Sequence, residues 1–158
     1  LKHDFTFRKE LDMRNLTVRD KILSSNSVSI HVRRGDYLQL INERLLVCDS
    51  HYYERAIDEI ARRIENPCFF IFSDDIEWCK IQFSYLPEKT FIDWNRNFNS
   101  YKDMHLMSLC KYNIIANSSF SWWAAWLNNY PQKIVIAPRL WFNDRQDLSY
   151  VPPSWIKV

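Results

Sequence analysis

The chain has 158 residues, the length of one ordinary domain, and 47% of them are apolar, so it can close a core and disorder is excluded. Its 21 basic and 19 acidic residues leave a net charge of only +2, which argues against a nucleic-acid binder. No apolar run reaches the length of a membrane span, and the first residues resemble the interior of a longer protein.

Two helices and two strands are predicted for the first half of the chain. The spaced apolar residues of segment 7–23 predict a helix, and the alternating SVSIHV of residues 27–32 predicts a strand. A loop then leads to a helix over residues 50–66, with Ser50 as its expected N-cap. The apolar CFFIFS of residues 68–73 predicts a strand that is covered on both faces.

The second half of the chain continues this alternation. We predict helices over residues 74–86, 100–112 and 119–129, and strands over residues 89–93, 113–117 and 133–138. Gly35 is the single glycine, whereas a chain of hairpins would need many. The sequence therefore predicts an α/β fold with a doubly wound, mainly parallel, Rossmann-like sheet of about five strands.

One domain is expected over residues 1–158. It consists of a leading helical segment (1–26), the sheet with its helices (27–137) and a tail (138–158) that packs across the surface. The four cysteines form no CxxC and no metal-ligand spacing, so we expect buried thiols, Cys68 and Cys110 above all, in a reducing cytoplasm.

Polar clusters follow three of the predicted strands. The first strand ends in His31, Arg33, Arg34 and Asp36. The second strand ends in Ser73, Asp74 and Asp75, and the fourth strand ends in Asn117, Ser118 and Ser119. Ligands of open α/β sheets bind beyond the carboxyl ends of the strands. We therefore expect these clusters to converge on one site.

The doublet Arg33-Arg34 has two interpretations of equal weight. Guanidinium groups suit phosphate oxygens, and a turn at Gly35 would let both arginines reach one ligand. Alternatively, both pair with nearby aspartates as a structural cluster. An exposed RGD adhesion tripeptide fits poorly, because the motif directly follows a strand.

The segment NSSFSWW favours the phosphate interpretation. Ser118 and Ser119 precede a helix whose free N–H groups and dipole would face the arginines, which makes a two-sided anion clamp. Simple N-capping by either serine is compatible with that role. At least one of Trp122 and Trp123 is expected in the core.

The remaining candidates are weaker. Asp74 is placed to accept from ribose hydroxyls or to hold an arginine, and Asp75 to cap the next helix. Asp103 and His105 are weak signals taken singly, because such residues are usually a cap and a packed ring. Two arginines among carboxylates would repel a divalent cation, so no metal site is predicted.

Five stretches together resemble one known family. They are similar to the donor-binding C-terminal domain of α-1,2-fucosyltransferases, glycosyltransferase family 11. The five stretches are HVRRGDY, FFIFSDDIEWCK, KDMHLMSLCKYNIIANSSFSWWAAWLN, KIVIAPRLWF and VPPSWIKV. The bacterial branch, which builds O-antigens and capsules, is the most similar. The likeness runs from about residue 28 to the end of the chain.

The resemblance implies half of a GT-B glycosyltransferase. Such an enzyme is inverting and metal-independent, needs no cofactor, and moves L-fucose from GDP-β-L-fucose to a galactose hydroxyl in α-1,2 linkage. Arg33 would hold the β-phosphate while Arg34 supports it or orders the loop, and Ser118 and Ser119 would bind the pyrophosphate.

Further roles follow from the same resemblance. The positions of His31 and Asp103 contact guanine in related enzymes, and Asp74 and Asp75 would support the donor site. The partners implied are a nucleotide-sugar donor, a glycan acceptor and an N-terminal acceptor domain that is missing here, so the isolated domain is not necessarily active. No nucleic acid is expected. The implied location is the cytoplasm, with peripheral contact to a bacterial inner membrane, or alternatively the Golgi lumen.

Inversion requires a base opposite the leaving group. Asp36 is the nearest candidate and Glu43 the second, although Asp36 equally suits orienting an arginine. Two other functions stay open: a non-catalytic nucleotide- or phosphate-binding module, and a structural α/β interaction module in which arginines and aspartates pair among themselves.

Overall fold

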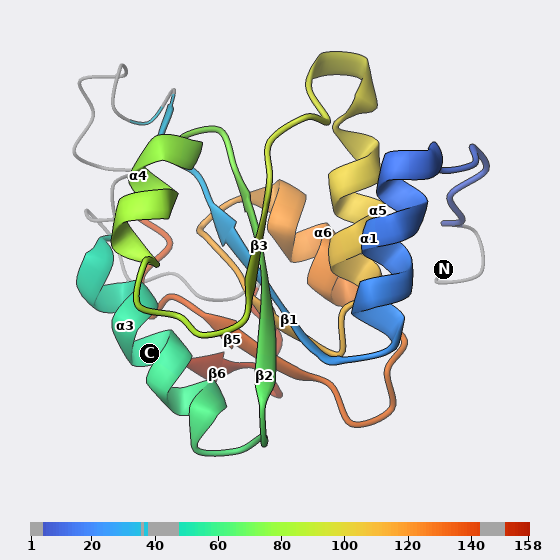
Figure 1. Cartoon of the computed structure of the whole chain (residues 1–158). Helices are drawn as coiled ribbons and strands as arrows, with labels where there is room; N and C mark the ends of the chain where they lie inside the picture. The colour runs from blue at the N-terminus through green and yellow to red at the C-terminus, as the bar shows by residue number, and fades with distance from the viewer. Residues whose placement is uncertain (1–4, 36, 38–47, 143–150) are drawn as a thin grey trace.

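The computed structural model describes residues 5–35, 37, 48–142 and 151–158. Its centre is a six-stranded sheet in the order β3-β2-β1-β4-β5-β6, in which every pair is parallel (Figure 1). The strands are β1 (Asn26–Val32), β2 (Pro67–Ser73), β3 (Lys89–Ile92), β4 (Tyr112–Ile114), β5 (Ile134–Ala137) and β6 (Ile156–Lys157). This confirms the predicted doubly wound α/β fold, whose strand order reverses direction between β1 and β4.

Helices cover both faces of this sheet. One face carries α3 (Ser50–Ala61) and α4 (Ile76–Gln82), and the other carries α1 (Met13–Leu23), α5 (Tyr101–Leu109) and α6 (Ser119–Leu127) (Figure 1). A short 3-10 turn, η3 (Asn97–Asn99), precedes α5. Burial from both sides explains why β2 is almost continuously apolar and why the polar residues Ser27, Ser29 and His31 of β1 are buried as well.

Several element ends differ from the prediction. The first helix begins at Met13, because the Asp12 carboxylate accepts a hydrogen bond from the Asn15 amide at 3.1 Å and caps it. Asp49, not Ser50, caps α3 by accepting from the Tyr52 amide at 2.8 Å. Asp12 lies inside the segment that was predicted to be helical from residue 7, whereas Asp49 lies one residue ahead of the predicted cap.

The tail also differs from the prediction. Residues 138–158 were expected to pack across the surface and the sheet to end by residue 137. Instead, the chain end returns as β6, which pairs with β5 between Ile136 and Ile156 and makes a sixth strand. Trp155, only 5% exposed, packs beside it against Trp122 with ring centroids 5.6 Å apart. Trp122 is partly buried and packs against the core at this contact, whereas Trp123 is exposed.

All four cysteines are buried free thiols, as predicted for Cys68 and Cys110. Within the described ranges, no helix combines the length and the apolar character that crossing a bilayer requires.

Trp155→Ala tests the role of the tail. Because the indole is enclosed, its removal should lower the free energy of unfolding by about 3–5 kcal/mol. Trp123→Ala is the control, since Trp123 is 37% exposed and its loss should cost less. Urea unfolding followed by circular dichroism measures both; equal losses would show that the tail does not complete the core.

Candidate functional site

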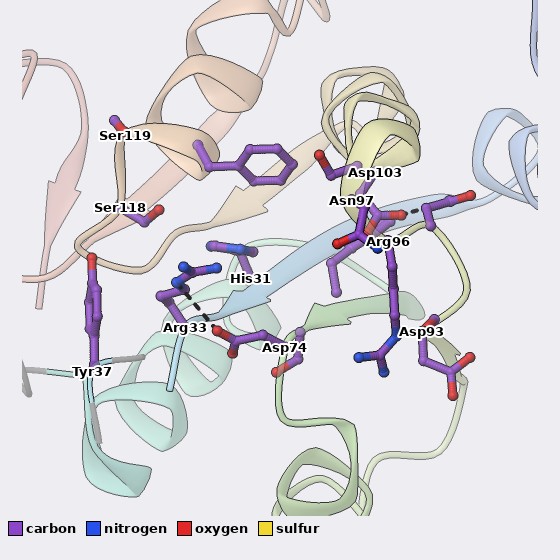
Figure 2. Close-up of a pocket in the computed structure, with 15 residues that line it drawn as sticks. His31, Arg33, Tyr37, Asp74, Asp93, Arg96, Asn97, Asp103, Ser118 and Ser119 are labelled. Carbon is purple, nitrogen blue, oxygen red and sulfur yellow. Dashed lines mark hydrogen bonds and ion pairs between the residues drawn. The ribbon is translucent and has the colours of Figure 1, made fainter. Parts of the chain in front are cut away.

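A cavity of about 580 Å³ opens at the carboxyl ends of the strands (Figure 2). It is lined by the ends of β1 and β2, by the segment between β3 and α5, and by the start of α6. Three of these four walls are the predicted polar clusters, which therefore do converge. The cavity lies where the strand order reverses, the usual ligand position in such sheets.

Two ion pairs join the ends of β1 and β2. The strands pair up to Val32 and Ser73, so Arg33 and Arg34 emerge opposite Asp74 and Asp75. The Nε atoms of Arg33 and Arg34 each lie 3.3 Å from a carboxylate oxygen, of Asp74 and Asp75 respectively. The pairing of both arginines with aspartates is thus confirmed, and a cavity opens beside the pairs. The phosphate interpretation stays a prediction.

The two arginines point in different directions. Arg33 lines the cavity, and 38% of its side chain is exposed. Arg34 has only 17% of its side chain exposed and lies over the Trp78 ring of α4, with its guanidinium carbon 4.3 Å from the ring centroid. Arg33 is therefore the arginine of the doublet that is placed to meet a ligand.

Gly35 allows this close approach of the two strand ends. A Cβ atom at this position would lie 3.0 Å from Oδ2 of Asp74. The other Asp74 oxygen accepts from the Arg34 backbone N–H at 2.9 Å. One carboxylate therefore fixes the backbone of the turn and pairs with Arg33.

The start of α6 forms the wall facing Arg33 (Figure 2). Ser118 is the N-cap residue, but its hydroxyl makes no capping hydrogen bond, so N-capping by a serine side chain is not what the structure shows. Ser118 and Ser119 both line the cavity, at the positive end of the helix dipole. Free N–H groups at a helix start bind anions.

His31 lies at the floor of the cavity and is 6% exposed. Burial lowers its pKa to about 4, and Arg33 adds to this effect while Asp74 opposes it. The imidazole is therefore neutral at pH 7. Its Nδ1 atom is buried without a hydrogen-bond partner among the described residues, which leaves a polar atom for a bound molecule.

Asp103 lines the cavity from the first turn of α5. Burial raises its pKa to about 7, although a hydrogen bond from Asn95 and the nearby Arg96 lower it. Asn95 donates to its carboxylate at 2.7 Å. A carboxyl with this pKa exchanges its proton near neutral pH.

Other predicted residues lie outside the cavity lining. Asp75 caps α4, as predicted, by accepting from the Trp78 amide at 3.3 Å. His105 is a packed ring that stacks on Phe7 with centroids 4.3 Å apart. Asp36 and Glu43, the candidate bases, fall outside the described residues, and their roles stay predictions.

The wall between β3 and α5 was not predicted from the sequence. Asp93, Asn95, Arg96 and Asn97 line the cavity there. They follow the third strand directly, so the rule that found the other three clusters would have found this one. Tyr37, whose hydroxyl donates to the Asn117 carbonyl at 3.1 Å, was also missed.

Comparison with known proteins gives a consistent result. The sequence model of Glycosyl transferase family 11 matches residues 3–158. An alpha-1,2-colitosyltransferase of Escherichia coli is 44% identical in an alignment that covers 94% of this chain and 52% of that protein. The O-antigen biosynthesis glycosyltransferase WbnK of Escherichia coli is 39% identical, over 85% of this chain and 45% of its own length. The chain thus spans about half the length of the curated relatives it matches.

More distant similarities extend beyond bacteria and to solved structures. Human galactoside alpha-(1,2)-fucosyltransferase 1 is 37% identical over 63% of this chain and 28% of that protein. Fucosyltransferase NodZ from Bradyrhizobium superposes with a TM-score of 0.52 at 17% identity, over 72% of this chain and 40% of that chain. At this identity the superposition establishes the fold alone, and it agrees with the predicted half of a GT-B enzyme.

Asp103→Asn tests the buried carboxyl through stability. The folded chain keeps the proton of Asp103 up to about pH 7, whereas the unfolded chain releases it near 3.8. Folding is therefore opposed increasingly as pH rises from 4 to 7, by at most ~1.4 kcal/mol per pH unit. The melting temperature of the variant should gain on the wild type over this range and then level off.

Asp20→Asn, which changes an exposed carboxylate on α1, is the control for this stability experiment. An equal pH-dependent gain in both variants would contradict the special position of Asp103.

Proposed function

We propose that this chain, which belongs to glycosyl transferase family 11, binds GDP-β-L-fucose as the donor-binding part of an inverting transferase. The complete enzyme would transfer L-fucose in α-1,2 linkage to a galactose hydroxyl of a glycan. The observation that carries the proposal is the cavity flanked by the Arg33 guanidinium on one side and the start of α6 on the other. That arrangement suits a diphosphate.

The diphosphate fits these walls for electrostatic reasons. Guanidinium N–H groups form charge-assisted hydrogen bonds with phosphate oxygens, and the N–H groups at a helix start add more donors. Charge accumulates on GDP when the bond from the sugar to the β-phosphate oxygen breaks, so the same groups stabilise the transition state. They supply the positive charge without a metal ion, which is why we propose metal-independent transfer.

The nucleoside would occupy the part of the cavity between His31 and Asp103. Guanine offers two adjacent N–H donors on one edge, which match a carboxylate acceptor. The unpartnered Nδ1 atom of the neutral His31 is a further group available to the base. Support for this placement comes from the lining of one continuous cavity by these residues and by the proposed diphosphate site.

The transfer step forms one bond and breaks one. A galactose hydroxyl oxygen attacks the anomeric carbon, GDP leaves from the opposite face, and the hydroxyl proton passes to a base. Asp36 is our first candidate for this base and Glu43 the second. The acceptor surface would belong to the remaining half of the enzyme, because the chain matches 52% and 45% of two bacterial relatives.

Arg33→Ala should weaken GDP binding. Losing charge-assisted hydrogen bonds worth about 1.5–3 kcal/mol predicts a Kd that is about 10- to 100-fold higher by calorimetry. Arg62→Ala is the matched control, since it removes an exposed arginine from the end of α3. Excess EDTA should change neither result. Wild-type affinity in a folded Arg33→Ala variant would refute the proposed diphosphate site.

A second candidate donor is GDP-colitose, because the 44% identical relative is named a colitosyltransferase. Colitose is L-fucose without its 3-hydroxyl group, so both sugars present the same diphosphate and base. We expect GDP-fucose to bind more tightly, by about 1 kcal/mol for one additional hydrogen bond. Competition calorimetry with both donors measures this difference. Tighter binding of GDP-colitose would identify GDP-colitose as the donor of this protein instead.

A further inference from the structure

Two buried amide side chains, those of Asn15 and Asn95, connect the first helix to the candidate site through hydrogen bonds. Asn15 of α1 is 0% exposed and Asn95 is 6% exposed. Nδ2 of Asn15 donates to Oδ1 of Asn95 at 3.0 Å, and Nδ2 of Asn95 donates back to Oδ1 of Asn15 at 2.7 Å. Nδ2 of Asn95 also donates to Oδ1 of Asp103 at 2.7 Å. The two amides therefore lock together beside the Asp103 carboxyl.

Further hydrogen bonds attach the Asn15 amide to residues at the start of α1. Nδ2 of Asn15 donates to both oxygens of Asp12, at 3.0 and 2.9 Å, and Nζ of Lys102 holds Asp12 at 2.7 Å. Oδ1 of Asn15 additionally accepts from Nε1 of Trp94 at 3.2 Å. Asp12 itself is exposed, but the two amides are buried and fully partnered, so any rearrangement of the amide pair would leave a buried group unsatisfied.

Asn15 decides which end of the Asn95 amide faces Asp103. Oδ1 of Asn95 is occupied as the acceptor for Asn15, so only Nδ2 can be presented to Asp103. The amide oxygen in that place would repel the carboxylate. Nδ2 occupies one carboxylate oxygen, and no described residue forms a hydrogen bond with the other.

We propose that Asn15 and Asn95 are positioning residues that hold Asp103 with one oxygen occupied and the other available to the base of the donor. This inference rests on the proposed function for the identity of the base, but not for the positioning itself. Asn15 belongs to a helix outside the cavity lining, so its effect on a ligand would pass through Asn95.

Several other charged or titratable groups surround Asp103 and would influence its proton. They are Asp93 and Arg96 before α5, Lys102 on α5, His31 of β1, Arg33 directly after β1, Asp74 after β2, and Asp12 before α1. Among these groups, Arg96 favours the ionised carboxyl and Asp93 opposes it. The hydrogen bond from Asn95 is the larger favourable influence, so its removal should dominate.

The decisive measurement is the titration of the Asp103 carboxyl by ¹³C NMR in the protein without nucleotide. The resonance is assigned by its loss in Asp103→Asn. We expect a midpoint near pH 7 in the wild type and a rise of about 1 pH unit in Asn95→Ala. Asn15→Leu keeps Asn95 but removes the hydrogen bonds that fix the orientation of its amide. We expect this variant to raise the Asp103 midpoint by less than Asn95→Ala does.

Asn113→Ala is the matched control. Asn113 is also a buried amide in a paired network, donating to Ser29 at 2.7 Å and accepting from Asn128 at 2.8 Å. The Asn113→Ala variant should lower the melting temperature without moving the titration midpoint of Asp103. An unmoved midpoint in Asn95→Ala, or an equal movement in Asn113→Ala, would overturn the positioning role.

GDP binding separates this inference from the proposed function. Wild-type affinity should fall about tenfold per pH unit below pH 7, and in Asn95→Ala the fall should begin at higher pH. In an Asp103→Asn background, Asn95→Ala should have the same effect on affinity at every pH. If the carboxyl titration moves as expected but GDP affinity is independent of pH, the positioning stands and the guanine contact is refuted.

Discussion

The arrangement of the site depends on two charge pairs that extend the register of β1 and β2. The strands pair residue by residue up to Val32 and Ser73, and the two arginines that follow on one strand meet the two aspartates that follow on the other. A register shift of one residue would break both pairs and reverse the faces of the strands. The pairing therefore links the packing of the core to the geometry of the cavity.

The order of strands and helices could be predicted from the sequence because short apolar or β-branched segments alternate with longer helical ones and the chain has one glycine. The ends were harder to predict. Asp12 begins α1 inside the stretch 7–23, which had been predicted as helical throughout, and Asp49 caps α3 one residue before the expected cap Ser50. β6 is only two residues long and follows a pair of prolines, so no periodicity marks it. Its pairing with β5 is a property of the assembled sheet.

The candidate site was predictable to the extent that it depends on strand ends. Arg33, Asp74, Ser118 and Ser119 were found because a parallel sheet brings its carboxyl ends together. The direction of each side chain could not be predicted from the sequence. Only the structure shows that Arg34 turns toward Trp78. The pairing of Asn15 with Asn95 could not be predicted, because a buried amide pair 80 residues apart leaves no local pattern in the sequence.

The same ion pairs explain why one arginine can serve a ligand and the other cannot. The side chain of Arg33 is 38% exposed, and an ion pair this accessible contributes only about 0–1 kcal/mol, so the diphosphate of the proposed donor would displace Asp74 from it. Asp74 then still accepts from the Arg34 backbone N–H. If Arg34 turned away instead, it would lose its contact with Trp78 and leave Asp75, the cap of α4, without its cation. The fold thus keeps Arg34 as the fixed member of the doublet and leaves Arg33 to exchange partners.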